Sequence, residues 1–109
     1  MPTFQEFQAF DIRVGTIRSA RPHPTARHPA FQLEIDFGEL GRKRSSARLT
    51  TLYTPETLVG RQVLAVINFP PRRVADFTSD VLVLGAMLPD DEVVLLAPER
   101  AVPDGTPIA

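Results

Sequence analysis

Phe31-Gln32-Leu33-Glu34-Ile35-Asp36-Phe37-Gly38 alternates apolar and polar residues without an error until its closing glycine. This period of two predicts a β-strand with one buried face and one exposed face. The segment Glu39-Leu40-Gly41 then predicts a turn, and residues 43–52 predict a further strand with Ala47 and Leu49 on one face. Residues 31–52 therefore predict two successive strands joined by a turn.

Residues upstream of this pair predict a strand, a loop and a short helix. In residues 12–18 the apolar positions change parity at Gly15, which is typical of a β-bulge or a barrel corner. Residues 21–29 hold three prolines and both histidines, so we expect a loop there. Thr3 and Glu6 have the spacing of a capping box, which predicts a short N-terminal helix.

Residues downstream predict a very short helix and then more strands. Thr54 is the expected N-cap of that helix, Pro55 its first residue and Gly60 its end. Residues 63–69 and 81–87 are nearly continuous apolar runs, which predict strands covered on both sides. After a last short strand at residues 93–96, the order is three strands, a helix and further strands. This order predicts an all-β fold with short helices, the five-stranded OB-fold β-barrel.

The length of 109 residues suits a single domain. Within residues 1–109 we expect an N-terminal helical segment (1–10), the barrel (11–97) and a C-terminal extension (98–109). A small barrel buries one face of each strand, so the two doubly apolar runs leave apolar surface uncovered. We therefore expect a homodimer that uses the later strands and a terminal segment.

Composition excludes several functional classes. The net charge is −1 and cysteine is absent, so nucleic-acid affinity must come from local clustering, and thiolate metal sites are excluded. His23 and His28 have no third ligand at a suitable spacing, so we expect no metal. No glycine-rich phosphate loop or nucleophile motif is present, which argues against an enzyme and a cofactor. Without a long apolar run or signal-peptide pattern, we expect a cytoplasmic protein that does not insert into membranes.

Two basic elements stand out. In the stretch Asn68-Phe69-Pro70-Pro71-Arg72-Arg73 the prolines end the strand, and they hold two arginines at the start of a stiff loop over residues 70–80. A guanidinium can bind two phosphate or carboxylate oxygens at once. The alternative is an ordinary ion pair with Asp76 or Asp80. A second cluster lies on the third strand, where it either binds phosphate or blunts an exposed strand edge, and it consists of Arg42, Lys43, Arg44 and Arg48.

Six segments, in this order along the chain, carry a resemblance to a known family. They are Asp11-Ile12-Arg13-Val14-Gly15-Thr16-Ile17, Ile35-Asp36-Phe37-Gly38, Ser45-Ser46-Ala47, Gly60-Arg61-Gln62-Val63, Asn68-Phe69-Pro70-Pro71-Arg72-Arg73 and Ser79-Asp80-Val81-Leu82-Val83-Leu84. From about residue 4 to residue 108 the chain resembles the EMAP-II-like tRNA-binding domains. Its Ser-Ser-Ala and Phe-Pro-Pro-Arg-Arg forms resemble the stand-alone secretion chaperones of the CsaA type more than the domains appended to methionyl-tRNA synthetases.

The resemblance implies an OB-fold homodimer without catalytic activity. Its relatives bind tRNA by shape at the outer corner of the L, and members of the CsaA type are described as chaperones for unfolded or export-bound preproteins. By position, the resemblance places an RNA surface on Ser45, Ser46, Arg72, Arg73, Ser79 and Leu82. Together with the basic third strand, the expected tRNA-binding residues are Arg42, Arg44, Ser45, Ser46, Arg72, Arg73, Ser79 and Leu82.

An alternative function belongs to a different class. Apolar grooves near Phe69, Pro71, Phe77 and Leu82 could bind extended, unfolded chains as a molecular chaperone does. Phe69 and Phe77 could equally be core residues. The expected partners are thus tRNA or another structured RNA, or preproteins and the secretion machinery, and the sequence leaves open which of them matters in the cell.

Overall fold

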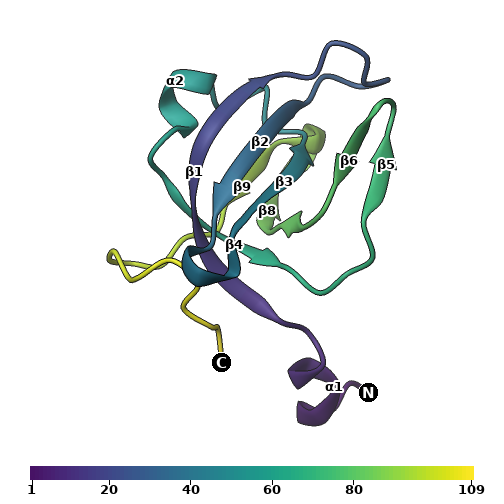
Figure 1. The fold of residues 1–109 in the computed structure, drawn as a ribbon. Helices are drawn as coiled ribbons and strands as arrows, with labels where there is room; N and C mark the ends of the chain where they lie inside the picture. The colour runs from purple at the N-terminus through teal and green to yellow at the C-terminus, as the bar shows by residue number, and fades with distance from the viewer.

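The computed structural model describes residues 1–109. Five strands form the main antiparallel sheet in the order β3-β2-β1-β4-β7 (Figure 1). Their bounds are β1 (Ile12–Pro22), β2 (Phe31–Asp36), β3 (Arg42–Ala47), β4 (Gln62–Val66) and β7 (Leu82–Val83). Two antiparallel ribbons complete the strands, and they are β5 (Arg72–Val74) with β6 (Phe77–Ser79) and β8 (Gly85–Met87) with β9 (Val93–Leu95). The helices are α1 (Phe4–Gln8), α2 (Pro55–Leu58) and the 3-10 turns η1 (Gly38–Leu40) and η2 (Pro89–Asp91).

The alternation in β2 is confirmed residue by residue. Phe31, Leu33 and Ile35 are buried, whereas the polar residues between them are partly exposed. The same parity continues to Phe37, one of the largest fully buried side chains. β2 pairs with β1 on one side and with β3 on the other, so its apolar face forms the centre of the core.

β1 forms the corner of the barrel. Its first part pairs with β4 and its second part with β2, and Thr16 pairs with both neighbours. At Gly15, an added Cβ would lie 2.7 Å from the Phe37 ring, so only a glycine lets the two strands pack this closely. The corner was predicted correctly, but the register shift falls between Ile17 and Ser19 instead of at Gly15.

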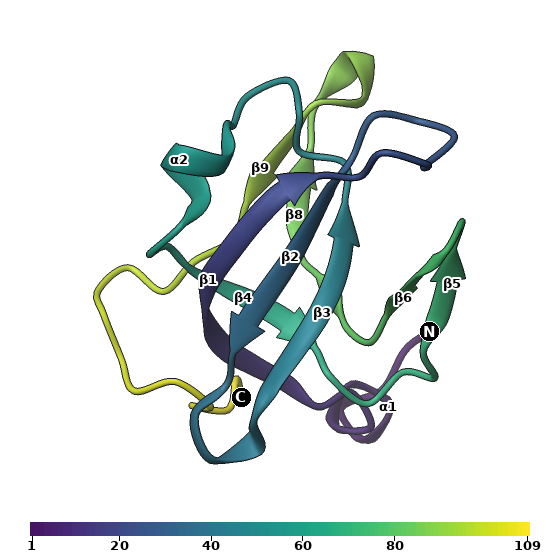
Figure 2. The same ribbon diagram turned by 45° about the horizontal axis from the view of Figure 1, so that its top comes forward.

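Hydrogen bonds from β3 to residues 79–81 nearly close the sheet into a barrel (Figure 2). The amides of Asp80 and Val81 donate to the Arg44 carbonyl, at 2.8 and 3.3 Å. The Ser46 amide donates to the Ser79 hydroxyl at 3.0 Å. This arrangement confirms the prediction of an all-β, OB-like barrel with short helices.

Several predicted elements differ from the structure. β1 continues to Pro22 instead of ending near residue 18, and β4 ends at Val66 instead of residue 69. β3 ends at Ala47 because the chain turns there and buries Leu49, with the Leu49 amide donating to the Ala47 carbonyl at 3.0 Å. The expected loop at residues 70–80 is instead the β5–β6 ribbon, which turns at Ala75 and Asp76. The run at residues 81–87 is divided into β7 and β8 by Leu84, whose amide donates to the Leu64 carbonyl at 2.9 Å.

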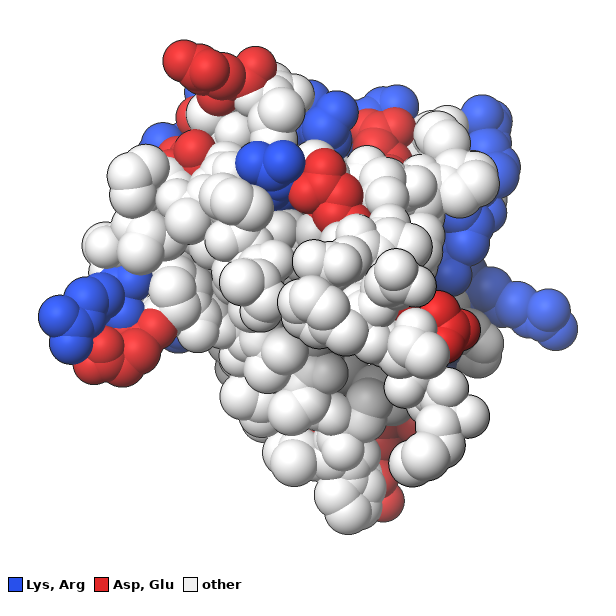
Figure 3. Space-filling view, turned by 90° about the horizontal axis from the view of Figure 1, so that it is seen from below, with Lys and Arg blue, Asp and Glu red and all other residues white.

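α1 projects from one end of the barrel and buries none of its residues (Figure 1). The predicted capping box is present, since the Glu6 amide donates to the Thr3 hydroxyl at 3.1 Å. Asn68 ties the end of the helical segment to the barrel: its side chain accepts from the Asp11 amide at 2.9 Å and donates to the Ala9 carbonyl at 2.8 Å. The surface seen from this end carries few charged groups in its middle (Figure 3).

α2 and the C-terminal tail cover the remaining edges of the barrel. The N-cap Thr54 and the leading Pro55 begin α2 as predicted, and its Leu58 enters the core. The tail lies along the first part of β1, where the Val14 amide donates to the Thr106 carbonyl at 3.0 Å. None of the helices has the length and hydropathy that crossing a bilayer requires.

Candidate nucleic-acid interface

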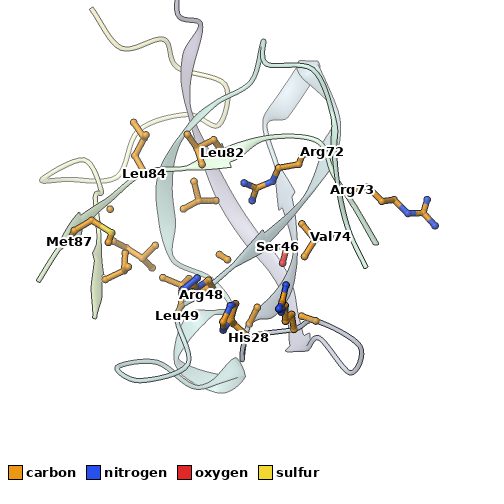
Figure 4. Close-up of a pocket in the computed structure, with 18 residues that line it drawn as sticks. His28, Ser46, Arg48, Leu49, Arg72, Arg73, Val74, Leu82, Leu84 and Met87 are labelled. Atoms are coloured by element: carbon orange, nitrogen blue, oxygen red, sulfur yellow. The ribbon is translucent and has the colours of Figure 1, made fainter. Parts of the chain in front are cut away.

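A cleft of about 620 Å³ opens beside the barrel, between the β5–β6 ribbon, the end of β3 and the β7–β9 segment (Figure 4). Eleven of its 18 lining residues are hydrophobic, and none is Asp or Glu. The basic residues around it are Arg27, His28, Arg48, Arg72 and Arg73. A cleft that combines several cations with no carboxylate has a local positive potential, although the chain as a whole has a net charge of −1.

The β5–β6 ribbon holds the two arginines that the sequence singled out. Arg72 pairs in register with Ser79, and Arg73 pairs with Thr78. The Arg72 side chain extends over the cleft, whereas Arg73 points away from it (Figure 4). The Arg73 guanidinium donates from Nε to the Ala75 carbonyl at 3.0 Å. Both residues are exposed, so their remaining donors are available to a ligand.

The alternative of an ion pair within this loop is not observed. The Asp76 carboxylate accepts from the Thr25 hydroxyl at 2.6 Å, and it lies 3.7 Å from His23. The Asp80 carboxylate lies 3.9 Å from Nε of Arg44. The two acidic residues nearest in sequence to the ribbon arginines are therefore directed to other partners.

Two of the three basic residues of β3 have carboxylates beside them. Arg42 donates to Glu34 at 2.8 Å, a neighbour on β2. Arg44 lies near Asp80 and also over the Phe77 ring, 5.1 Å from the ring centre. These contacts partly neutralise the β3 edge, which fits the alternative of a charged and solvated edge strand.

Two of the predicted serines face inward and do not reach the surface. Ser45 is 1% exposed and donates from its hydroxyl to the Val81 carbonyl at 3.2 Å. Ser79 is also buried, and its hydroxyl accepts from the Ser46 amide. A ligand on the surface cannot reach either hydroxyl, so Ser45 and Ser79 hold β3 against the ribbon instead. The prediction that the hydroxyls of Ser45 and Ser79 contact RNA is therefore corrected, because both serines are buried.

Among the predicted RNA residues, the cleft brings together Ser46, Arg72, Arg73 and Leu82. Arg42 and Arg44 are not among its lining residues. The sequence reasoning missed Arg27 and His28 in the loop after β1, together with the apolar residues Leu84 and Met87. The adjacent basic residues Arg27 and His28, which lie between Pro24 and Pro29, were the one local signal for this wall of the cleft.

The predicted peptide groove is not formed by its four residues. Phe77 is 7% exposed, with its ring against His23 at 5.5 Å between centres. Phe69 packs edge-on against Phe10 at 5.8 Å, and neither it nor the exposed Pro71 lines the cleft. Leu82 alone lies in the cleft, where the apolar surface consists of residues such as Leu49, Leu84, Met87 and Leu95.

Two carboxylates have lowered pKa values. The pKa of Asp76 lies below its usual value, mainly because its carboxylate accepts a hydrogen bond from the Thr25 hydroxyl. The Gly38 amide, donating at 2.9 Å, lowers the pKa of Asp36, and the nearby Arg18 guanidinium lowers it further. Both carboxylates therefore remain charged at neutral pH.

No group of three or more His, Cys, Asp or Glu side chains is placed to hold a metal ion.

Comparisons with a family model, with solved structures and with protein sequences give concordant matches. Residues 12–107 match the family model described as a putative tRNA binding domain. The structure superposes on a crystal structure of the chaperone CsaA from Bacillus anthracis, with 52% identity, a TM-score of 0.96, and coverage of 100% of this chain and 99% of that one. The crystal structure of CsaA from Picrophilus torridus has 43% sequence identity and a TM-score of 0.92, with 100% of both chains covered.

A further match is to part of a larger enzyme. The chain is 34% identical over 104 residues to methionine–tRNA ligase from Methanococcoides burtonii. That alignment covers 95% of this chain and 15% of the ligase, so the chain spans a small part of the length of such relatives. These matches confirm the resemblance that the sequence motifs carried.

Proposed function

This chain belongs to the family of putative tRNA binding domains, and we propose on that premise that it binds structured RNA, with tRNA as the expected ligand. The observation that carries the proposal is the cleft, which gathers arginines from three separate elements and contains no acidic residue. Phosphate groups are the ligands that such a set of guanidiniums favours. Expected contacts to tRNA come from Arg27, Arg48 and Arg72.

The mechanism we propose is recognition of shape through phosphate positions. Arg27 lies in the loop after β1, Arg48 follows β3, and Arg72 begins β5. Because three separate elements of the fold carry these cations, their spacing suits phosphates fixed by a folded RNA. The cleft has no Phe, Tyr or Trp among its lining residues, so we expect little base stacking and little sequence preference.

We further propose that the protein acts as a homodimer. On α1, Phe4 is 72% exposed and Phe7 is also exposed, and on the later strands Met87 is 70% exposed. Monomeric proteins seldom expose so many large apolar side chains, and a second copy of the chain would cover them. Sedimentation at micromolar concentration should show a dimer, and a monomer alone would contradict this part of the proposal.

The proposed role is one of binding without catalysis. The family model that matches the chain is described by binding, and the ligases that it resembles are several times longer than this chain. The expected compartment is the cytoplasm, where tRNA is found.

A titration of labelled tRNA at low and near-physiological salt tests the RNA proposal. Single-stranded RNA of equal length is the matched control ligand. We expect micromolar or tighter binding that favours folded tRNA and weakens steeply as salt rises. Equal and weak binding to both RNAs, lost at physiological salt, would contradict the proposal.

A second candidate function is favoured by the apolar floor of the same cleft. Eleven of the lining residues are hydrophobic, and the two closely similar crystal structures are of chaperones. We propose that extended segments of unfolded preproteins are the alternative ligand, with Leu82 among the contacts. Apolar binding should persist or strengthen with salt, whereas RNA binding should weaken. A salt series with an unfolded polypeptide and with tRNA therefore separates the two candidates.

A further inference from the structure

His23 is buried against β3 and the β5–β6 ribbon, with one ring nitrogen unpaired. It directly follows β1, and its amide donates to the Ala30 carbonyl at 2.9 Å, which closes the loop between β1 and β2. Its side chain is 0% exposed, and its Nε2 atom has no hydrogen-bond partner. Buried polar atoms are nearly always paired, so an unpaired nitrogen here requires a physical explanation.

The unpaired nitrogen faces the turn of the β5–β6 ribbon. Nε2 of His23 lies 3.7 Å from Oδ1 of Asp76, slightly beyond hydrogen-bond distance. The same carboxylate oxygen accepts from the Thr25 hydroxyl, in the loop after β1. Asp76 thus joins the tip of the ribbon to the loop, and His23 lies beneath this connection.

The other neighbours of His23 come from β3 and β6. Its Nδ1 atom lies 3.4 Å from the Ser46 hydroxyl, and its ring packs against Phe77. A cation, Arg44, lies over the Phe77 ring and has the Asp80 carboxylate 3.9 Å away. The imidazole is therefore in contact with the ribbon and with β3, and it belongs to the loop that carries Arg27 and His28.

We propose that His23 is a positioning residue for RNA binding, because its protonation draws Asp76 inward and sets the ribbon against the loop. The proposal rests on the RNA-binding function proposed above. In this arrangement the ribbon brings Arg72 and the loop brings Arg27 to the same cleft. Neither His23 nor Asp76 lines the cleft, so their effect on RNA reaches it through the positions of the arginines.

The chemistry of imidazole gives the direction of the effect. A protonated histidine has N–H donors on both ring nitrogens, so Nε2 then carries a donor directed at Asp76 whichever nitrogen holds the proton in the neutral ring. A charge-assisted bond would then shorten the contact from 3.7 Å to about 2.8 Å. The Thr25 hydroxyl keeps the pKa of Asp76 low, so this carboxylate still carries its charge when the imidazole gains a proton. RNA affinity should therefore be higher with His23 protonated than with His23 neutral.

The experiment uses a background with one histidine. The chain has two, and His28 lines the cleft, so His28→Gln leaves His23 as the sole imidazole. The ratio of tRNA affinity at pH 5.5 to that at pH 8 should be about fivefold in this background. Adding Asp76→Asn, which keeps an oxygen for Thr25 but removes the charge, should reduce the ratio to about one.

The matched control removes a carboxylate charge elsewhere. Asp90 lies in η2 with a positive φ of 69°, a conformation that asparagine tolerates well, and it does not line the cleft. His28→Gln with Asp90→Asn should keep the fivefold ratio. If Asp76→Asn keeps the ratio as well, or if Asp90→Asn abolishes it, the proposal is overturned.

A measurement without RNA separates this proposal from the RNA-binding function. NMR titration of the free His28→Gln variant should show the Asp76 and Phe77 amides shifting with the same midpoint as the His23 ring. This shift should be lost with Asp76→Asn. Amides that do not follow His23 would refute the positioning role even where tRNA binds well. A wild-type protein that shows the shift but binds no tRNA would refute only the RNA-binding function, together with the part of this inference that depends on it.

Discussion

β3 and β5 have similar basic sequences but differ in their surroundings. β3 begins Arg42-Lys43-Arg44, and β5 begins Arg72-Arg73. In β3, Arg42 lies beside the carboxylate of Glu34 from β2. Arg44 lies beside the carboxylate of Asp80, which follows β6. The arginines of β5 have no such partner, and one of them reaches over a cleft without acidic residues.

This difference shows that a run of basic residues does not by itself define a binding surface. The carboxylates that partly neutralise Arg42 and Arg44 are Glu34 and Asp80, which lie 8 and 36 residues away in sequence. Strand pairing brings them together, so the free positive charge is a property of the fold. We therefore propose that RNA binds at β5, whereas Arg42 and Arg44 of β3 form structural ion pairs.

The largest effect should come from the double variant Arg72→Ala, Arg73→Ala. We expect tRNA affinity to fall at least about tenfold, because charge-assisted contacts to phosphate are lost. Fluorescence anisotropy with labelled tRNA at low salt measures the loss. A loss below twofold, with the thermal unfolding midpoint unchanged, would remove β5 from the interface.

The single variants Arg72→Ala and Arg73→Ala should lose different amounts of tRNA affinity. Arg72 reaches over the cleft, whereas Arg73 points away and is held by the Ala75 carbonyl. We expect a loss of about fivefold for Arg72→Ala and about twofold for Arg73→Ala. The same anisotropy assay compares them, and the reverse order would show that RNA approaches the ribbon from its outer side.

Removing the carboxylate partner of an arginine in β3 should leave that arginine unpaired, as the arginines of β5 are. Glu34→Gln removes the carboxylate that contacts Arg42, so we expect tRNA affinity to rise about twofold. Asp91→Asn, in the distant turn η2, controls for the change in net charge. Equal gains in both variants would attribute the effect to overall charge and not to Arg42.

The smallest effect should come from removing a paired arginine. We expect Arg42→Ala to change tRNA affinity by less than about twofold, and to change the free energy of unfolding by at most about 1 kcal/mol. Urea denaturation and the anisotropy assay measure the two quantities. A large loss of affinity would show that the Glu34 contact gives way to RNA.

The regular half of the barrel could be predicted from the sequence. The alternation from Phe31 to Phe37 fixed which face of β2 is buried, because a strand with one buried face repeats every two residues. Thr54 and Pro55 located the start of α2, and Thr3 that of α1, since each cap depends on residues within three positions. The sequence therefore predicted the features that depend only on residues close together in the chain.

The cleft side could be predicted only in part. The β5–β6 turn uses Ala75 at a φ of 55°, without the glycine or asparagine that marks a tight turn, so the ribbon was interpreted as a loop. The burial of Ser45 depends on the Val81 carbonyl, 36 residues away. The wall carrying Arg27 joins the cleft only through contacts of the folded chain. No local pattern encodes these long-range contacts.

The most direct test of the account is the salt dependence of tRNA affinity in three proteins. These are the wild type, Arg72→Ala with Arg73→Ala, and Arg42→Ala with Arg44→Ala. The slope of log K against log salt should be shallower by about 0.9 for each duplex phosphate contact that is lost. We predict a shallower slope for the β5 variant and the wild-type slope for the β3 variant. Equal reductions in both, or a reduction in the β3 variant alone, would contradict the assignment of RNA binding to the unpaired arginines.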